Sequence, residues 1–478
     1  MYLPRACYVI AGFVVAVVGC RSGPRTQVAQ SRNSSASVSA EQPTIGQARA
    51  VASVTTQPPI TAANFQEPLP GPAVGTLSGT TPEVMESVLS RQWLQAEVEA
   101  RNPTLEAMVA AWQAAAQVYP QRVALDDPVM MGMIAPESVG ANTTETAYAF
   151  QLNQKLPWHG KRSLRGAVAD ADADAAYLDV EDSRLQVRLA ADLAFFEYFL
   201  VTRLLELNGE NARKMQEFYE SAQARYRTNR AEQQDVLQAE LERADLARRQ
   251  LELERMRQVA IARINTLLRR WPDAPLPPPP GEPEPPAAPE DKSLAWQMAL
   301  QQRPDLAALA WRVQAAEAAL ELAYKNYYPD FDTFARYDTW WQPASTQGPL
   351  RTQIGMAMNL PVYRQKLQAA VCEAQSRLNQ RRAEFDQRAL QIQYEVLSAA
   401  EQVDESRKTV ALYSERLIPA AEQNVAAART SYDVGKLNFL QLAQTQRQLI
   451  AIRERQIESL VAYHRRASEL ARAIGDHR

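Results

Sequence analysis

Few residues of this chain have the types and spacing that chemistry requires. Its three histidines are far apart in the sequence: His159, His464 and His477. Three methionines fall close together, but in a predicted strand or loop: Met130, Met131 and Met133. Metal sites are built from clusters of such ligands, and no nucleophile–base pair, phosphate-binding loop or metal-ligand spacing is present. We therefore expect no enzyme, no bound metal and no cofactor.

One cysteine is placed for a covalent modification. An apolar run from Val9 to Val18 is too short to span a bilayer and suits the core of a secretory signal. The run ends in Val17-Val18-Gly19-Cys20, which resembles a bacterial lipoprotein box, where the cysteine sulfur receives a diacylglycerol. We interpret residues 1–20 as a lipoprotein signal peptide and Cys20 as the lipidated residue. An ordinary cleaved signal with an incidental cysteine is the alternative.

The composition of the 478 residues narrows the class of protein. The net charge is -3, so no basic surface argues for binding of nucleic acid. Cys7 and Cys20 lie in the signal and only Cys372 lies beyond it, so the mature chain cannot form an intramolecular disulfide framework. Residues 21–83 are rich in Ser, Thr, Ala, Gln and Pro without periodicity, and we expect them to form a disordered tether.

The elements that must position the other residues occur twice. Asn102-Pro103-Thr104-Leu105 opens one unit and Arg303-Pro304-Asp305-Leu306 opens the other. In each unit an Ala-rich helix, 105–118 or 306–324, precedes two short strands and a very long helix that begins after Pro157 or Pro361. A tandem period this long indicates duplication of a whole helix–hairpin–helix module.

We assign residues 84–271 to the first repeat, 272–290 to a linker and 291–478 to the second repeat. Ten of the eighteen residues from Pro272 to Pro289 are proline. Such a run favours an extended polyproline conformation, so the linker is expected to be a semi-rigid strap between the repeats.

Both long helices carry an apolar seam. Residues from Val371 to Leu417 keep the three-four spacing of a coiled coil, and residues from Leu164 to Leu189 do the same in the first repeat. At 1.5 Å per residue, a helix from 158 to 226 would reach roughly 100 Å. Pro419 either bends the second long helix or starts a new one.

Each long helix is followed by a turn and a returning helix. Gly435 supplies the left-handed residue for the second turn, and Asn229 stands at the same place in the first. The returning helices begin near Asp235 and near Gln441. We expect these two turns to be the distal tips of helical hairpins.

The segments between the helices are predicted to be strands. Residues 148–153 and 353–360 alternate between apolar and small or polar side chains, and their partners are expected at about 121–133 and 331–341. This pattern suits a strand with lipid on one side and water on the other, and a half-buried soluble sheet is the alternative. Four strands cannot close a barrel in one chain, so a membrane location requires several copies.

Taken together, these pieces resemble the TolC-like outer-membrane efflux proteins over residues 84 to 475. The matching pieces are the two repeat openings, the helix start Leu156-Pro157-Trp158-His159-Gly160-Lys161-Arg162, and the two tips with Asp235-Val236-Leu237 and Tyr432-x-x-Gly435. The helix start is most similar to the branch associated with heavy-metal export. Drugs, other small molecules and secreted polypeptides stay open as alternative cargo.

The resemblance implies a mainly α fold with a membrane β-barrel. Tandem long helical hairpins would form a trimeric α-barrel, a periplasmic tunnel, and each chain would give four strands to one twelve-stranded barrel in the outer membrane. The implied function is the exit duct of a tripartite efflux pump, a homotrimer that passively conducts substrate handed over by an inner-membrane transporter and a periplasmic adaptor. Lipidation would anchor it to outer-membrane lipid, with most of the chain in the periplasm.

The resemblance also implies a selective constriction near the tips. Family members often carry acidic side chains just after the second tip, but the matching residues here, Gln441 and Gln444, are neutral. The first-repeat counterpart of Gln441 is Asp235, which either forms a single acidic ring or is a solvated or capping aspartate. The strand–helix joints are expected at Pro157 and Pro361.

A lipid-anchored periplasmic coiled-coil scaffold without channel activity is the alternative function. Such a scaffold also needs helical seams, a tether and no chemistry. It does not require two strand hairpins at equivalent places in both repeats, and this feature favours the channel.

Overall fold

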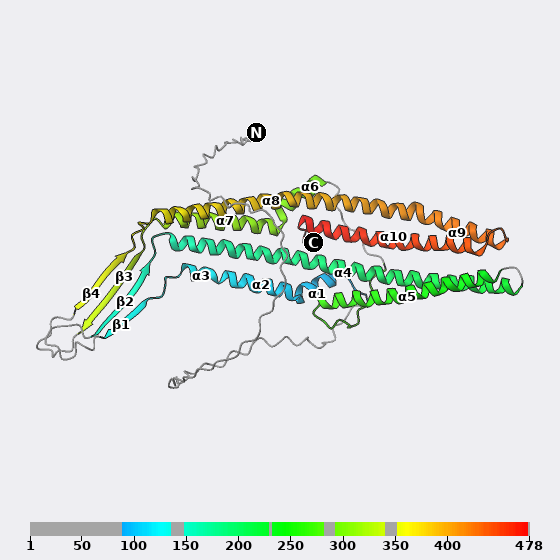
Figure 1. Ribbon diagram of the computed structural model, residues 1–478, viewed down its shortest axis with the longest axis horizontal. Coiled ribbons are helices and arrows are strands. Elements are labelled where there is room, and N and C mark those ends of the chain that lie inside the picture. The colour runs from blue at the N-terminus through cyan, green and yellow to red at the C-terminus, as the bar shows by residue number, and fades with distance from the viewer. Residues whose placement is uncertain (1–87, 135–147, 229–231, 282–291, 340–350, 477–478) are drawn as a thin grey trace, which may run out of the picture. The chain divides into compact units, whose positions relative to one another are not determined.

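The computed structural model describes residues 88–134, 148–228, 232–281, 292–339 and 351–476, all within one compact unit. The predicted tether, Cys20 and Asn229 lie outside these residues. The helices and strands of the described ranges follow one another as α1 Arg91–Arg101, α2 Pro103–Ala116, α3 Val118–Val123, β1 Val129–Ile134, β2 Tyr148–Leu156, α4 Lys161–Arg227, α5 Gln233–Leu267, α6 Lys292–Gln302, α7 Pro304–Lys325, β3 Phe331–Thr339, β4 Arg351–Met358, α8 Arg364–Leu412, η2 Tyr413–Leu417, α9 Ile418–Asp433 and α10 Phe439–Ile474 (Figure 1).

The same series of elements occurs twice, as the duplication predicts. A short helix (α1 or α6) precedes a helix that starts with proline (α2 or α7), then come two strands and a long helix that is turned back at its far end. Pro103 and Pro304 occupy the first turn of α2 and α7, where their missing N–H has no intrahelical partner to lose. The strands lie at one end of the long helices and the two hairpin tips at the other (Figure 1).

The first long helix, α4, has 67 residues and is continuous. It packs on α5, α7 and α10, and it carries the main core cluster, in which four aromatic side chains are no more than 1% exposed: Phe195, Phe196, Tyr198 and Phe199. Burial of one of these aromatic side chains contributes more to stability than burial of an alanine of the seam, because the aromatic side chain buries a larger apolar area. None of the helices in the described ranges combines the length and the apolar character needed to cross a membrane.

The second long helix contains a wider turn. The α8 helix runs into a π-helix, Tyr413–Leu417, and α9 follows with Pro419 in its first turn. Leu412, Leu417 and Ile418 all keep right-handed helical backbone angles. Pro419 therefore starts a new α-helical segment after a π turn, because the wider turn tolerates a residue that donates no backbone hydrogen bond.

The four strands form one antiparallel sheet in the order β1-β2-β3-β4. The strand expected at 121–133 was wrong at its start, because Val118–Val123 forms helix α3 and only Val129–Ile134 is a strand. Gly166 of α4 explains this difference: a Cβ there would lie 2.6 Å from a methyl carbon of Val123 and 3.0 Å from the ring of Tyr119. The glycine lets α3 pack directly on α4, a tertiary contact that strand propensity does not register.

The proline-rich segment is packed on the helices as far as it is described. The Asn265 side chain donates hydrogen bonds to the carbonyls of Pro272 and Ala274 at 3.1 and 2.8 Å, and Leu276 packs on the main core. The backbone N–H of Leu89 donates to the carbonyl of Pro278 at 2.9 Å. Residues 272–281 thus bind the end of α5 to the start of α1.

Candidate functional site: conduit wall and hairpin tips

The sheet has two chemically different faces. The strand register places these described side chains on one face, here called the apolar face: Met130, Phe150, Leu152, Phe331, Ala335, Tyr337, Ile354, Met356 and Met358. The other, called the polar face, carries Gln151, Asn153, Lys155, Asp332, Arg336, Asp338 and Gln353, together with Met131, Met133 and Phe334. Ile354 is 85% exposed and Met130 is 72% exposed, so the described part of the chain does not cover the apolar face. Lipid against the apolar face and water against the polar face would suit both sets of side chains.

The first strand–helix joint is a network that links the repeats. Pro157 follows the end of β2, and the Trp158 ring stacks between Tyr328 and Phe331 with centroids at 5.3 and 5.8 Å. The buried ammonium of Lys161 donates to Asp330 Oδ1 at 2.8 Å, and the backbone N–H of Trp158 donates to the same oxygen. The aspartate thus fixes the start of α4 against the start of β3.

The second joint is simpler in the described residues. Pro361 lies between the end of β4 and the start of α8, where the backbone N–H of Val362 donates to the Leu360 carbonyl. Asn359 accepts a hydrogen bond from the backbone N–H of Asp330 at 2.6 Å. Asp330 therefore contacts both predicted joints.

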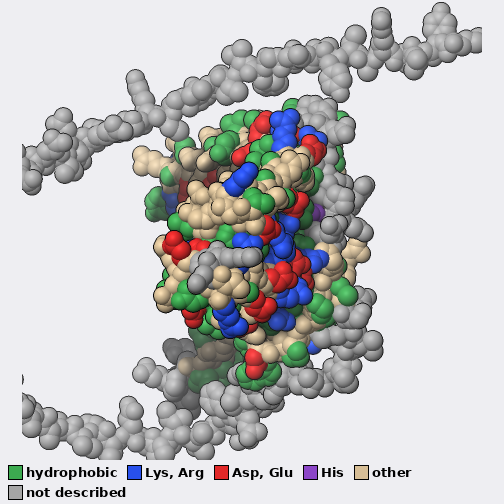
Figure 2. Space-filling view, turned by 90° about the vertical axis from the view of Figure 1, so that its right-hand side faces the viewer, with side chains coloured by type: hydrophobic (Ala, Val, Ile, Leu, Met, Phe, Trp, Pro, Cys, Tyr) green, Lys and Arg blue, Asp and Glu red, His purple; other side chains and the backbone are tan. Residues whose placement is uncertain are grey.

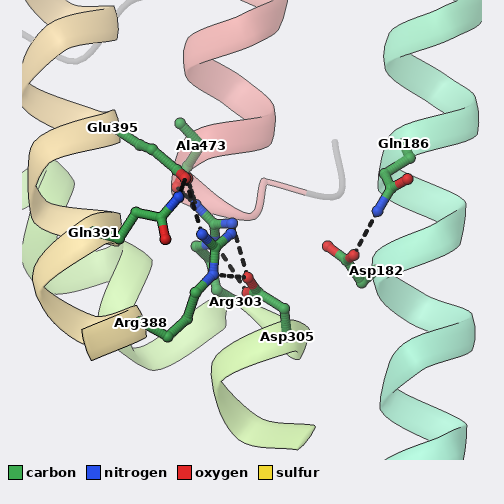
Figure 3. A network of polar contacts seen from close by, with 8 residues as sticks. All are labelled: Asp182, Gln186, Arg303, Asp305, Arg388, Gln391, Glu395 and Ala473. Carbon is green, nitrogen blue, oxygen red and sulfur yellow. Dashed lines mark hydrogen bonds and ion pairs between the residues drawn. The ribbon is translucent and has the colours of Figure 1, made fainter. Parts of the chain in front are cut away.

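Midway along the molecule, a buried arginine ties three helices together. The Arg303 guanidinium is 2% exposed, and it donates to both oxygens of Asp305 at 3.0 and 2.9 Å, to Glu395 at 2.7 Å and to the Ala473 carbonyl at 3.4 Å. Arg388 donates to Asp305 at 2.7 Å and to Glu395 at 2.9 Å (Figure 3). The two cations and two anions balance, so the charges are paired.

The charges in this network shift the pKa of both acids. Burial by itself raises the pKa of the Asp305 carboxyl, but hydrogen bonds and charge from Arg303 and Arg388 outweigh it and hold that pKa below its ordinary value. The pKa of Glu395 is lowered for the same reason, since its burial is outweighed by Arg303 and Arg388. Both carboxylates stay ionised and keep α7 and α8 bound to the end of α10.

The second hairpin tip has the turn that the sequence predicts. Gly435 follows the end of α9 with φ 76°, in the left-handed region. Asn438 caps α10 by accepting a hydrogen bond from the backbone N–H of Gln441 at 3.0 Å. Gln441 and Gln444 lie in the first turns of α10 and are exposed. Seen toward the tips, basic and acidic side chains are interspersed over this end of the molecule (Figure 2).

Asp235 lies in the first turn of α5, at the first tip. Burial and the neighbouring Glu232 charge raise the pKa of its carboxyl. An anion in the first turn of a helix also interacts favourably with the helix dipole. The structure therefore allows both sequence interpretations, an acidic residue at the constriction and a helix-start aspartate, and it places no acidic side chain at Gln441 or Gln444.

A contact that the sequence did not indicate ties the two tips together. Arg225, in the last turn of α4, donates to the Tyr432 carbonyl at 3.1 Å and to Asp433 Oδ1 at 2.8 Å. Its guanidinium lies 4.4 Å from the centroid of the Tyr432 ring, within cation–π range. A basic residue in the last helical turn is common, so nothing in the sequence pairs Arg225 with a residue two hundred positions away.

Comparison with known proteins finds similarity to outer-membrane efflux proteins. A sequence model of the family described as "Outer membrane efflux protein" matches residues 295–476, most of the second repeat. Residues 295–476 of this chain therefore form a domain of that family. The cobalt-zinc-cadmium resistance protein CzcC of Cupriavidus metallidurans is 24% identical over 341 residues, which cover 70% of this chain and 78% of the relative.

Solved structures show the same fold for this efflux protein. CusC superposes with a TM-score of 0.72 at 18% identity, covering 80% of this chain and 92% of CusC. VceC of Vibrio cholerae superposes with a TM-score of 0.69 at 18% identity, covering 80% of this chain and 96% of VceC. The fold expected from the sequence, mainly α with tandem long helical hairpins and four strands per chain, is confirmed.

The family and the fold together define the function at a coarse level. This efflux protein is an outer-membrane channel, the exit duct of an efflux system, with a large periplasmic portion. Among the described residues, no group of three or more His, Cys, Asp or Glu is placed to hold a metal ion.

Proposed function

We propose that three copies of this efflux protein close into one duct through their sheets. The sheet has one apolar and one polar face, and its edge strands β1 and β4 have no partner on their outer sides within the described chain. Joining β4 of each copy to β1 of the next gives twelve strands, satisfies the open edges, and puts lipid outside and water inside. The two-faced sheet with open edges is the observation that carries this proposal.

Two apolar stripes on the helices support the same assembly. On α5, four side chains are 51% to 69% exposed: Leu237, Leu241, Leu251 and Val259. On α8, four are 47% to 71% exposed: Leu390, Tyr394, Leu397 and Leu412. At about 100° per residue each set lies within an arc of roughly 80°. An uncovered stripe of this kind indicates packing against another helix, and neighbouring copies supply it.

The duct supplies a passage and no chemistry of its own. We propose that its tips dock onto a periplasmic adaptor, and that an inner-membrane transporter provides the energy. The tie between Arg225 and the Tyr432–Asp433 end of α9 holds the two hairpins together, so it resists widening of the tip. Cys20, outside the described residues, would anchor each copy to outer-membrane lipid.

The cargo we propose is a divalent metal cation such as cobalt, zinc or cadmium. The similarity to the resistance protein of Cupriavidus metallidurans supports this class of cargo. Growth of cells with and without the chain on graded concentrations of the three metal salts tests it. Cells that lack the protein are expected to tolerate less metal. If cells with and without the protein tolerate each of the three metals equally, the cargo must be sought among drugs, other small molecules or secreted polypeptides.

Asp235 is the proposed charged residue of the constriction, one per copy. A ring of carboxylates at a narrow point favours cations. We expect Asp235→Asn to reduce the preference of the open duct for cations over anions, measured as a shift in reversal potential across a salt gradient. Gln444→Glu at the second tip is the matched change in the opposite direction and should increase that preference. An unchanged reversal potential in both variants would show that Asp235 does not set the ion preference and only stabilises the start of its helix.

The experiment that tests the duct itself combines mass and conductance. The purified lipidated protein is expected to have the mass of a trimer in detergent and to give discrete current steps in planar bilayers. Arg225→Ala, which removes the tie between the tips, should give larger or more frequent steps. If the protein is a monomer and neither the parent nor Arg225→Ala conducts, the proposal of a duct is wrong and the lipid-anchored scaffold is the better account.

A further inference from the structure

Each edge strand carries one glycine opposite a phenylalanine of the neighbouring strand. Gly132 of β1 faces Phe150 of β2, and Gly355 of β4 faces Phe334 of β3. The first pair lies on the apolar face of the sheet and the second on the polar face. The chain therefore contains the same arrangement twice, once on each side of the wall.

The two pairs differ in how closely the ring approaches the glycine. A Cβ at Gly355 would lie 2.3, 2.6 and 3.0 Å from three carbons of the Phe334 ring. At Gly132 the nearest carbons of Phe150 would be 3.9 Å away, an ordinary van der Waals distance. Positive φ in the described residues is confined to positions other than these two glycines. Gly355 is therefore required for space and not for backbone conformation.

Phe334 is a large apolar side chain on a face that is otherwise mostly polar. Its register partners are Asn153 on one side and Gly355 on the other, and Gln151, Lys155 and Arg336 share the face. Because the ring lies over the glycine, it covers the Gly355 backbone and lies along the wall instead of standing out from it. Pairing of an aromatic ring with a strand glycine is a known stabilising device in sheets.

We propose that Gly355 seats the Phe334 ring against the inner wall and so sets the bore of the duct at this level. The inference rests on the proposed closure of the sheet, which places the polar face inside. Three copies put three Phe334 rings at one height. Any side chain at position 355 lifts all three rings off the wall at once, and the largest solute that passes becomes smaller.

The test measures the bore independently of the tips. In a Cys372→Ser background, Lys155→Cys places a thiol on the polar face on the helix side of Phe334, and Gln151→Cys places one on the loop side. Maleimide-polyethylene glycols of graded mass are applied to intact cells, from the loop side. We expect Gly355→Ala to lower the mass of the largest polymer that labels the Lys155→Cys protein. Labelling of the Gln151→Cys protein should be unchanged.

Three control variants isolate the ring. Gly132→Ala makes the same chemical change on the apolar face and should leave the size limit at 155 unchanged. Gly355→Ala combined with Phe334→Ala should restore the limit, because no ring is left to lift. Labelling of Gln444→Cys, at the tips, reports any polymer that reaches the periplasm by another route.

The outcomes separate the inference from the proposed function. An equal size limit with and without Gly355→Ala, in trimeric protein, would overturn the seating of Phe334, and so would an equal effect of Gly132→Ala. A monomeric parent protein, seen by light scattering, would instead refute the closed duct. If Gly355→Ala does not assemble, Gly355→Ala with Phe334→Leu takes its place and must still show a lower limit than Gly355→Ala with Phe334→Ala.

Discussion

His464 is a buried residue whose role is structural, and its environment makes it sensitive to pH. The ring stacks on Phe196 with centroids at 5.2 Å and is 3% exposed. One turn further along α10, Ser468 donates to Asp192, which also accepts from Arg91 and Gln95. Burial and the Arg91 charge lower the pKa of His464 to about 4 from 6.5. A neutral imidazole is therefore part of the packing of α1, α4 and α10.

Because of this histidine, the stability of the folded protein should decrease as the pH decreases. Its pKa in the folded state is lower than in the unfolded state, so the unfolded state takes up the proton first. The contribution is complete above about pH 6.5 and is lost as pH falls toward about 4. His464→Gln should flatten the fall of the melting temperature over this range. His159→Gln, at an exposed position, should leave the slope unchanged, and an equal slope in all three proteins would contradict the assignment.

At the scale of elements, the network around Arg303 holds α7, α8 and α10 together. Removal of one member leaves buried charges with fewer partners, which typically costs about 3–5 kcal/mol. We expect Arg303→Met to lower the melting temperature strongly. Arg312→Met breaks the pair with Asp179, whose side chain is 31% exposed, and should cost about 1 kcal/mol or less. Equal effects of the two variants, by thermal unfolding in detergent, would show that the buried network adds no more stability than the more exposed pair.

The two hairpins differ in how firmly they are packed. Most of the largest fully buried side chains belong to the first repeat, whereas α9 buries Tyr432 alone among its 16 residues. The second hairpin also contains the π turn before Pro419. Its tip packs on the first hairpin through a small apolar cluster that contains Tyr432, Phe439 and Leu442, and the Arg225 tie lies beside this cluster.

At the scale of the whole molecule, the stripes on α5 and α8 predict how copies assemble. Leu241→Glu with Leu251→Glu puts two charges into the α5 stripe, where burial of an unpaired charge is unfavourable. We expect this variant to be monomeric in detergent by light scattering. Val434→Glu at the second tip, 64% exposed and outside the stripe, should remain trimeric. A trimer in both cases would exclude the α5 stripe from the interface.

The sequence by itself determined the repeated architecture. The positions of α4, α7, α10 and of strands β2, β3 and β4 follow from periodicity, from proline at helix starts and from glycine at the second tip, which are local signals. Local signals act within a few residues, so they predict element type and order well. The two-faced character of the sheet also follows from the sequence, as alternation of apolar with small or polar side chains along single strands.

The tertiary structure alone decided which distant residues meet. Helix α3 took the place of the start of a predicted strand, because Gly166 leaves room for Val123 and Tyr119. Arg225 contacts Tyr432, and the Phe334 ring packs over Gly355. These contacts depend on strand register and on the packing of helices that are far apart in the chain, and a single side chain carries no signal of its partner. The wall of the duct could therefore be predicted from the sequence, whereas its bore and the tie between its tips could not.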